Sequence, residues 1–434
     1  MKYATYNEYK PSPMTWLDQL PTHWNAASLR WMSKRYAGGT PDKGNEAYWE
    51  DGEIPWINSG AVNDGYITQP SELITSEGFA NSSAKWIPKN ALVMALAGQG
   101  KTKGMVAQLG IATTCNQSMA ALIPDQRFAP RYLYYWLTAN YQNIRNLAGG
   151  EARDGLNLEM LGSIPCPVPS VDEQQTIARF LDAKTAQIDA LVAQKRQLIA
   201  KLKEKRSALI ARTVTRGLPP EAAKAAGLEP NPEMKDSGVN WLGQIPAHWT
   251  AKAVRYIFRN CDSRRIPLSS EERADLEKLY PYYGASGIID MVDDYLFDEP
   301  LVLVAEDGAN LLSRSTPLAF LATGKYWVNN HAHILKPLAG DIWYWVATLE
   351  TFDFSPLITG SAQPKLTADR LGGIQLPVPP VTEQAVIADY LAAKTRELDA
   401  LVSQAIEVIT RLTEYRQALI TSAVTGKIDV RGLA

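Results

Sequence analysis

The chain has 434 residues, of which 46% are hydrophobic and 21% charged, and its formal net charge is −2. This composition is typical of a globular protein, and it neither requires nor excludes a nucleic-acid partner. The sequence has no apolar run long enough for a transmembrane helix and no apolar core of a secretory signal near its start. Its three cysteines form no CxxC pair, so we expect a reduced, cytoplasmic protein without a membrane partner.

A short motif near the start of the chain is repeated in the middle. WLDQLPTHW runs from Trp16 to Trp24, and WLGQIPAHW runs from Trp241 to Trp249, which is a shift of 225 residues. Trp, Leu, Gln, Pro, His and Trp recur in register between the two copies. A repeat of this kind sets the architecture of the chain, because each copy is one structural unit.

The segment after the first motif consists of short apolar runs broken by Gly, Pro and Asn. AKWIPKNALVMALAG and ATTCNQSMAALIP are examples, and they predict strands joined by turns. PRYLYYWLTAN, residues 130–140, predicts a short aromatic helix, and DIWYWVATLE, residues 341–350, predicts its counterpart in the second half. Each half is therefore expected to be a mixed α+β domain with an aromatic core.

One loop in this segment matches a loose form of the phosphate-binding pattern. ALAGQGKTKG, residues 95–104, follows an apolar run and contains Gly-Lys-Thr. A phosphate-binding loop must open a helix, whereas Gly104, Gly110 and the β-branched residues beyond Thr102 favour a strand. The counterpart LVLVAEDGAN keeps Gly308 and lacks Lys-Thr. A P-loop NTPase is therefore a remote alternative.

The second repeated segment is a long helix. LGSIPCPVPSVDEQQTIARFLDAKTAQIDALV begins at Leu161 and returns from Leu371 with roughly half of its positions identical. Ser170 and Glu173 fit a capping box, and the apolar steps alternate between three and four residues, which is typical of a coiled coil. The first helix is basic and the second acidic, which favours pairing within the chain over two separately solvated helices. The predicted seam residues are Ile188, Leu191, Leu198, Leu202, Leu209, Leu398, Leu401, Val408, Leu412 and Leu419.

These motifs in duplicate order resemble the specificity subunit of type I restriction-modification systems. The resemblance rests on SGVNWLGQIPAHW, the repeated PVP…EQ…KT…DALV helix entry and YPYYGASGIID…VNNHAHILKPL, and it covers nearly the whole chain. It implies that each variable domain reads half of a split sequence in double-stranded DNA. The helices would set the gap between the half-sites and dock two modification (methyltransferase) subunits, and restriction subunits would join. S-adenosylmethionine, ATP and Mg would then bind to those partners, while this chain would hold no cofactor or metal and catalyse nothing.

The expected fold class is α+β with a pseudo-twofold internal repeat. Two similar mixed α/β target recognition domains are separated by two long antiparallel helices, which form an intramolecular coiled coil. The predicted boundaries are 1–164 for recognition domain 1, 165–216 for helical spacer 1, 217–237 for a connector, 238–374 for recognition domain 2 and 375–434 for helical spacer 2.

Polar residues in and beside the predicted loops have the chemistry to contact DNA, since amides and hydroxyls read base edges and cations hold phosphates. The candidates are Lys85, Lys89, Gln99, Lys101, Thr102, Lys103, Asn116, Gln117, Ser118, Ser313, Arg314, Asn329, Asn330, His331, Gln363 and Lys365. Asn and Gln in turns often satisfy only the backbone, so a part of this set is expected to touch DNA. The alternative is a coiled-coil scaffold that binds DNA without sequence preference.

Overall fold

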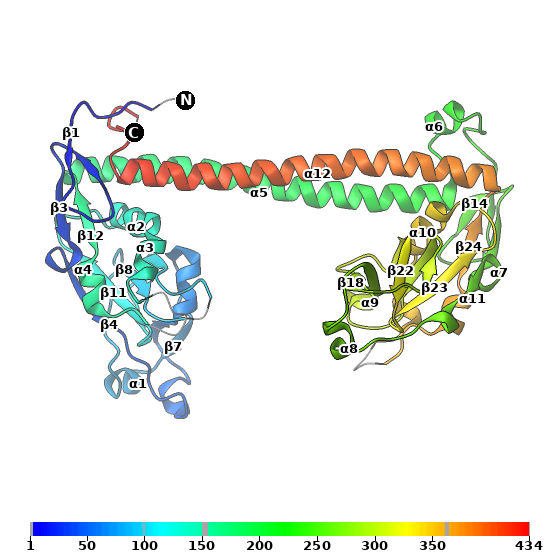
Figure 1. The fold of residues 1–434 in the computed structure, drawn as a ribbon. Helices are drawn as coiled ribbons and strands as arrows, with labels where there is room; N and C mark the ends of the chain where they lie inside the picture. The colour runs from blue at the N-terminus through cyan, green and yellow to red at the C-terminus, as the bar shows by residue number, and fades with distance from the viewer. Residues whose placement is uncertain (1–2, 99, 150–154, 361–363, 434) are drawn as a thin grey trace. The chain divides into compact units, whose positions relative to one another are not determined.

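The computed structural model describes the chain except for residues 1–2, 99, 150–154, 361–363 and 434. Two compact units are present (Figure 1): unit 1 contains residues 1–195 and 407–434, and unit 2 contains residues 196–406. Among the described residues, no helix combines the length and the apolar character needed to cross a membrane.

The recognition domain of unit 1 is built around a five-stranded sheet in the order β4-β11-β8-β9-β6, beside a three-stranded sheet in the order β10-β5-β7. Its strands are β1 Tyr9–Pro11, β2 Gln19–Pro21, β3 Asn25–Ser28, β4 Ser33–Ala37, β5 Ile54–Ile57, β6 Tyr66–Ile67, β7 Glu72–Ile74, β8 Leu92–Ala95, β9 Val106–Leu109, β10 Thr114–Cys115, β11 Met119–Pro124 and β12 Pro165–Val168. Its short helices are η1 Leu29–Trp31, η2 Glu46–Tyr48, η3 Ser59–Asp64, α1 Ser76–Ala80, α2 Pro130–Ala139, α3 Tyr141–Asn146 and α4 Leu158–Ser163.

Unit 2 repeats this plan with two four-stranded sheets, in the orders β16-β23-β20-β21 and β18-β17-β22-β19. Its strands are β13 Met234–Asp236, β14 Gln244–Pro246, β15 Thr250–Ala253, β16 Phe258–Asn260, β17 Tyr280–Gly284, β18 Gly287–Val292, β19 Phe297–Asp298, β20 Leu301–Ala305, β21 Ala319–Ala322, β22 Lys325–Val328, β23 Ala332–Pro337 and β24 Gln375–Val378. Its short helices are α6 Pro220–Ala225, α7 Val254–Ile257, η4 Asp262–Arg264, α8 Ser270–Ala274, α9 Asn310–Ser313, α10 Ile342–Thr351, η5 Ser355–Leu357 and α11 Ala368–Gly373.

One inner strand in the five-stranded sheet of unit 1, and one in the sheet β16-β23-β20-β21 of unit 2, is a continuous apolar run. Every residue of β8 is buried and lies between the antiparallel neighbours β9 and β11, and every residue of β20 is buried between β21 and β23. A strand that is covered on both faces needs apolar side chains at each position, which explains the two runs seen in the sequence. The aromatic helices α2 and α10 cover these sheets and supply buried Trp136 and Trp345 to the two cores.

The two repeated motifs meet at one buried carboxylate in unit 1. The Glu173 carboxylate accepts hydrogen bonds from the Tyr6 hydroxyl at 2.7 Å and the Trp24 indole at 3.1 Å, and it lies 3.0 Å from His23 Nε2. Ser170 accepts from the Glu173 backbone amide at 3.3 Å. The expected capping box is therefore half formed, because the Glu173 side chain turns toward the His-Trp motif and not back to the helix end.

Unit 2 repeats this junction with fewer hydrogen bonds. Glu383 lies 2.8 Å from His248 Nε2, but Trp249 Nε1 is buried without a partner among the described residues. Gln174 and Gln384 add a matched second anchor, since each donates to the carbonyl of a proline just before its helix. These contacts fix the recognition domain of each unit on the start of a long helix.

The long helices α5 (Val171–Arg216) and α12 (Val381–Val424) pair within each unit, as predicted. Arg416 contacts Asp189 at 2.9 Å in unit 1, and Arg206 contacts Asp399 at 3.1 Å in unit 2. These ion pairs occupy matched positions, because both residues of the first pair lie 210 positions from their counterparts in the second.

The predicted seam is displaced by one residue in part of its length. Ile188, Leu398 and Leu419 are buried and Leu202, Leu209 and Leu412 are half-buried, but Leu191, Leu198, Leu401 and Val408 are exposed. Val192, Ile199, Val402 and Ile409 are the half-buried residues in their place. Each correct position is preceded by a second apolar residue, so the heptad pattern alone could not choose between the two.

Candidate nucleic-acid interface

The Gly-Lys-Thr loop of unit 1 joins two antiparallel strands. It leads from β8 to β9, where Leu92 pairs with Gln108, and the described residues between these two strands form no helix. Gly100 and Gly104 have positive φ angles of 71° and 82°, so these glycines serve the tight hairpin. The P-loop interpretation is therefore wrong, because the helix amides that would hold a nucleotide phosphate are missing here.

The same loop presents one exposed lysine. Lys101 is exposed, and its backbone carbonyl accepts a hydrogen bond from the Tyr141 hydroxyl at 2.5 Å. Arg145 fixes the neighbouring Gly100 carbonyl at 2.8 Å. Thr102 is half-buried, and Lys103 is buried with an interaction of its own. Lys103 therefore cannot contact a phosphate without rearrangement, whereas Lys101 can.

Two further candidate lysines of unit 1 are exposed, and one candidate cannot be placed. Lys85 lies 5.8 Å above the centre of the Tyr36 ring, and Lys89 is exposed at the start of the turn before β8. Gln99 lies outside the described residues. Lys85, Lys89 and Lys101 are thus exposed, and they remain candidates for phosphate contacts.

The polar turn before β11 holds the remaining candidates of unit 1. Gln117 is exposed, and its side-chain oxygen accepts a hydrogen bond from Thr40. Asn116 is half-buried, and its Oδ1 has no donor within the described chain. Ser118 is half-buried, and its backbone carbonyl accepts a hydrogen bond from the Leu96 amide at 2.8 Å. The turn therefore presents amide groups beside the end of β8.

The matching turn of unit 2 precedes β23. Asn329 is buried and its side chain accepts from the His331 amide at 2.8 Å, which makes it part of the turn itself. Asn330 and His331 are exposed, and both carboxylate oxygens of Asp307 lie 2.9 Å from His331 Nδ1. Asp307 thereby orients the imidazole, so that Nε2 is the ring atom left for an outside partner.

The other candidates of unit 2 differ in whether their side chains are already paired within the protein. Arg314 is held by the Phe352 carbonyl at 3.0 Å and the Glu350 carboxylate at 3.4 Å, so it fixes the end of α10. Ser313 is exposed next to it. Lys365 pairs with Glu306 at 3.1 Å, and Gln363 lies outside the described residues.

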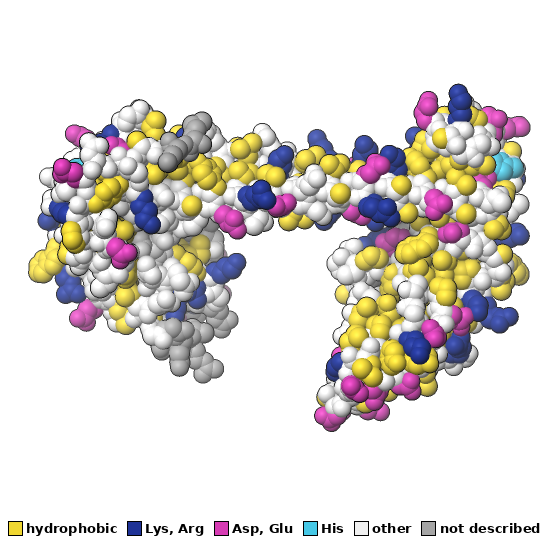
Figure 2. All heavy atoms as spheres, turned by 45° about the horizontal axis from the view of Figure 1, so that its top comes forward, with side chains coloured by type: hydrophobic (Ala, Val, Ile, Leu, Met, Phe, Trp, Pro, Cys, Tyr) yellow, Lys and Arg dark blue, Asp and Glu magenta, His cyan; other side chains and the backbone are white. Residues whose placement is uncertain are grey.

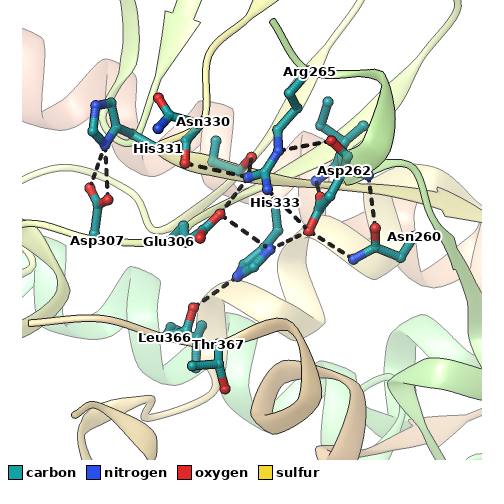
Figure 3. A network of polar contacts seen from close by, with 12 residues as sticks. Asn260, Asp262, Arg265, Glu306, Asp307, Asn330, His331, His333, Leu366 and Thr367 are labelled. Atoms are coloured by element: carbon teal, nitrogen blue, oxygen red, sulfur yellow. Dashed lines mark hydrogen bonds and ion pairs between the residues drawn. The ribbon is translucent and has the colours of Figure 1, made fainter. Parts of the chain in front are cut away.

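A buried ion network lies directly beneath the Asn330–His331 turn (Figure 3). His333 Nδ1 lies 2.6 Å from Asp262 Oδ2 and 3.6 Å from Glu306 Oε2, while His333 Nε2 lies 2.9 Å from the Leu366 carbonyl. Arg265 contacts Glu306 and donates to the Ala332 carbonyl at 2.8 Å. The network joins four chain segments. Asp262 and Arg265 come from η4 and the residue after it, His333 from β23, Glu306 from the position after β20 and Leu366 from the segment before α11.

The contacts of His333 fix its protonation state. A carbonyl oxygen only accepts, so Nε2 carries a proton, and Nδ1 faces two carboxylates and must carry one as well. Burial lowers the pKa of His333, but the Asp262 carboxylate outweighs burial and holds that pKa above its ordinary value. Burial also opposes the ionisation of Glu306, yet Arg265, His333 and Lys365 keep the pKa of that carboxyl below its ordinary value.

Asp262, Glu306 and His333 also have the donor chemistry of a metal site, and their ligand atoms lie within 4.8 Å of one another. However, Arg265 pairs with Glu306 and lies 3.7 Å from Asp262, Lys365 also pairs with Glu306, and both ring nitrogens of His333 are engaged. The arrangement is that of a closed ion network and not of an open coordination site.

Comparison with known proteins identifies the chain. A family model described as the type I restriction modification DNA specificity domain matches residues 24–201 and again residues 247–411. The chain belongs to this specificity family. The two matches fall on the two copies of the repeat, so the specificity domain is present twice.

Individual members of the specificity family support the assignment. The chain is 30% identical to the EcoR124I/EcoR124II specificity subunit of Escherichia coli, over 42% of this chain and 45% of that protein, so the match spans about half of the relative's length. It is 22% identical to the StySPI specificity subunit of Salmonella potsdam, over 95% of this chain and 91% of that protein. A solved structure from work on complex assembly of the type I R-M system has the same fold, with a TM-score of 0.66 at 16% identity, covering 94% of this chain and 99% of that one.

The two specificity domains share the contacts that join each domain to the long helices, and they differ at their polar turns. The Glu-His pairs and the helix pair recur, whereas Asn116-Gln117-Ser118 in unit 1 stands where unit 2 has Asn329-Asn330-His331. The ion network beneath the second turn was not predicted from the sequence. The signal available was the alternation of His with apolar residues in NNHAHIL, but its acidic partners come from distant segments.

Proposed function

We propose that this chain is the DNA sequence-specificity subunit of a type I restriction-modification enzyme. Each recognition domain reads one half of a bipartite target in double-stranded DNA, and the paired helices set the distance between the halves. The observation that supports this most strongly is the contrast between a duplicated frame and divergent polar turns. A protein that reads two different half-sites needs the same scaffold twice, with different side chains in the turns that contact the bases.

The chemistry of the exposed turns suits base recognition. Gln117 and Asn330 carry amides that can donate and accept at once, which is how Gln and Asn read adenine in the major groove. The oriented His331 adds a ring nitrogen beside Asn330. Lys85, Lys89 and Lys101 are exposed and suit phosphate contacts, which position a protein on DNA without reading sequence.

The helix pair carries apolar residues that the pair itself does not bury. Leu191, Val408 and Tyr415 are exposed in unit 1, and Leu198 and Leu401 are exposed in unit 2. Figure 2 shows hydrophobic side chains along the surface of α5 and α12. A two-stranded coiled coil needs only its central seam, so a second apolar stripe suits packing against further helices. We assign this stripe to the docking of two modification subunits.

The catalytic steps then belong to the partners. The modification subunits would bind S-adenosylmethionine, and restriction subunits would use ATP and Mg, while this chain supplies recognition and spacing without catalysis. A cytoplasmic location accompanies this proposal, because the DNA to be modified is there.

The experiment is to co-express the chain with its modification subunit in a strain without DNA methyltransferases and to sequence the methylated bases. The proposal predicts one bipartite motif with a fixed gap. Exchange of residues 238–374 for the corresponding domain of another specificity subunit should change one half of the motif only. Absence of any bipartite motif in a stable complex would reject the proposal, and equal binding to all sequences would favour the non-specific scaffold.

A further inference from the structure

The buried ion network of unit 2 stands where unit 1 has uncharged residues. In unit 1, β11 pairs with β4 from Pro124 opposite Ser33, and in unit 2, β23 pairs with β16 from Pro337 opposite Phe258. Counting residues along these matched strands gives the equivalent positions in the two units. The backbone amides of Leu96 and Glu306 confirm the count, because they donate to the carbonyls of Ser118 and His331, respectively. Asp262, Glu306 and His333 therefore stand where unit 1 has Ala37, Leu96 and Ala120. Arg265, which follows η4, falls at Thr40 when the same count is continued past the strand.

Stability alone does not explain this replacement. Leu96 and Ala120 belong to the apolar core of unit 1, so the site can be filled without charge. Glu306 and His333 have side chains that are 9% and 2% exposed, and removing charges from water to this degree offsets most of their attraction. Replacing buried ion pairs by an apolar cluster of similar volume is often neutral or stabilising, which points to a role of the network beyond stability.

The contacts of the network can fix the position of the turn that carries Asn330 and His331. Arg265 holds the Ala332 carbonyl at 2.8 Å and reaches the Asn330 carbonyl at 3.5 Å, on either side of His331. His333 holds the Leu366 carbonyl, and Glu306 holds the Lys365 ammonium. Figure 3 shows the contacts of Arg265 and His333 beside the turn that carries Asn330 and His331. Both ends of this turn and the neighbouring segment are thereby tied to one buried cluster.

We propose that Asp262, Arg265, Glu306 and His333 are positioning residues for sequence reading by the second recognition domain. They hold the turn at residues 329–331 and the segment at residues 364–366 in one relative position, so that Asn330 and His331 meet the base edges in a fixed register. The first recognition domain has no such ion network, because the equivalent residues are uncharged and its turn is held by the hydrogen bond from Thr40 to Gln117. This inference rests on the proposed function.

The test transplants the unit 1 residues into unit 2. The variant carries Asp262→Ala, Arg265→Thr, Glu306→Leu and His333→Ala, which removes two positive and two negative charges together and leaves no buried charge alone. The variant and the natural chain are each co-expressed with the modification subunit, and methylation sequencing gives their motifs. A control variant carries Arg273→Gln with Asp290→Asn, which removes a partly buried ion pair on α8 and β18 at 2.8 Å in the same unit.

The transplanted variant should retain the folded state, and the half-site read by unit 2 should become degenerate. Discrimination there should fall on the order of tenfold to a hundredfold, as expected for the loss of one or two base contacts. The half-site read by unit 1 and the motif of the control variant should not change. An unchanged motif in a folded transplant, or equal degeneracy of both half-sites, would overturn the inference.

If the transplant does not fold, Glu306→Gln and Glu306→Asp decide the question. Loss of discrimination in the Gln variant with retention in the Asp variant supports a role for the charged carboxylate, and an unchanged motif in both variants overturns it. The natural chain separates this inference from the function it rests on. If the natural chain yields no bipartite motif, the proposed function fails, whatever the variants do.

Discussion

Replacing Glu173 by Ala should destabilise unit 1 more than Glu383→Ala destabilises unit 2. Both carboxylates are buried and face a histidine, so the cavity and the lost His contact are similar in the two variants. Glu173 accepts two additional hydrogen bonds, from Tyr6 at 2.7 Å and Trp24 at 3.1 Å. A hydrogen bond to a charged group contributes about 1.5–3 kcal/mol, so the difference between the variants should be at least about 3 kcal/mol.

Hydrogen exchange measured by mass spectrometry can follow each unit in the full chain. The free energy of opening is read from amides of α2 in unit 1 and of α10 in unit 2, and each variant is compared with the natural chain. The unaffected unit in each variant serves as the internal control. Equal losses of free energy in the two units, or a larger loss in unit 2, would refute the assignment of these hydrogen bonds.

Three further predictions concern the helices, the ion network and the Gly-Lys-Thr loop. Val192→Asp should destabilise the helix pair in thermal unfolding because Val192 is half-buried in the seam, whereas Leu191→Asp should leave the melting temperature unchanged and weaken co-purification of the modification subunit. Since the pKa of His333 is raised in the folded state, its stabilisation of unit 2 is fully present below about pH 6.5 and is lost as the pH rises through the raised value. Hydrogen exchange of unit 2 across this pH range should show the loss of stability, and His333→Ala should remove this pH dependence. Lys101→Ala should weaken DNA binding and lower the salt slope of the binding constant by about 0.9, with an unchanged slope removing Lys101 from the phosphate contacts.

The repeat made the overall architecture predictable from sequence. The matched Trp and His positions and the PVP…EQ helix entry indicated two similar domains and two paired helices, and the structure confirms both within the described chain. The same repeat removed the P-loop interpretation, because the apparent nucleotide loop had a counterpart without Lys-Thr.

The seam register was only partly predictable for a physical reason. At residues 191–192 and 401–402, Leu is followed by Val, and either residue can fill a heptad position. The choice depends on the rotation of each helix, which is set by distant contacts such as Arg416 with Asp189. Pairwise contacts of this kind leave no signal in the local pattern.

The candidate DNA contacts were predicted from the chemistry of their side chains alone. Only the structure shows which of them are exposed and which are buried. Lys103 and Asn329 look like their exposed neighbours in sequence, yet both are buried. The acidic partners of His333 lie at residues 262 and 306 in sequence, and only the pairing of β16, β20 and β23 brings them together. Residues joined across a sheet in this way cannot be recognised from spacing along the chain.

The measurement that tests the central claim most directly is the methylated sequence motif produced by this chain with its modification subunit. The account predicts two short specific halves separated by a fixed number of unspecified bases, with one half following residues 238–374 when that domain is exchanged. A single continuous motif, or a motif in which both halves change with one domain, would contradict it.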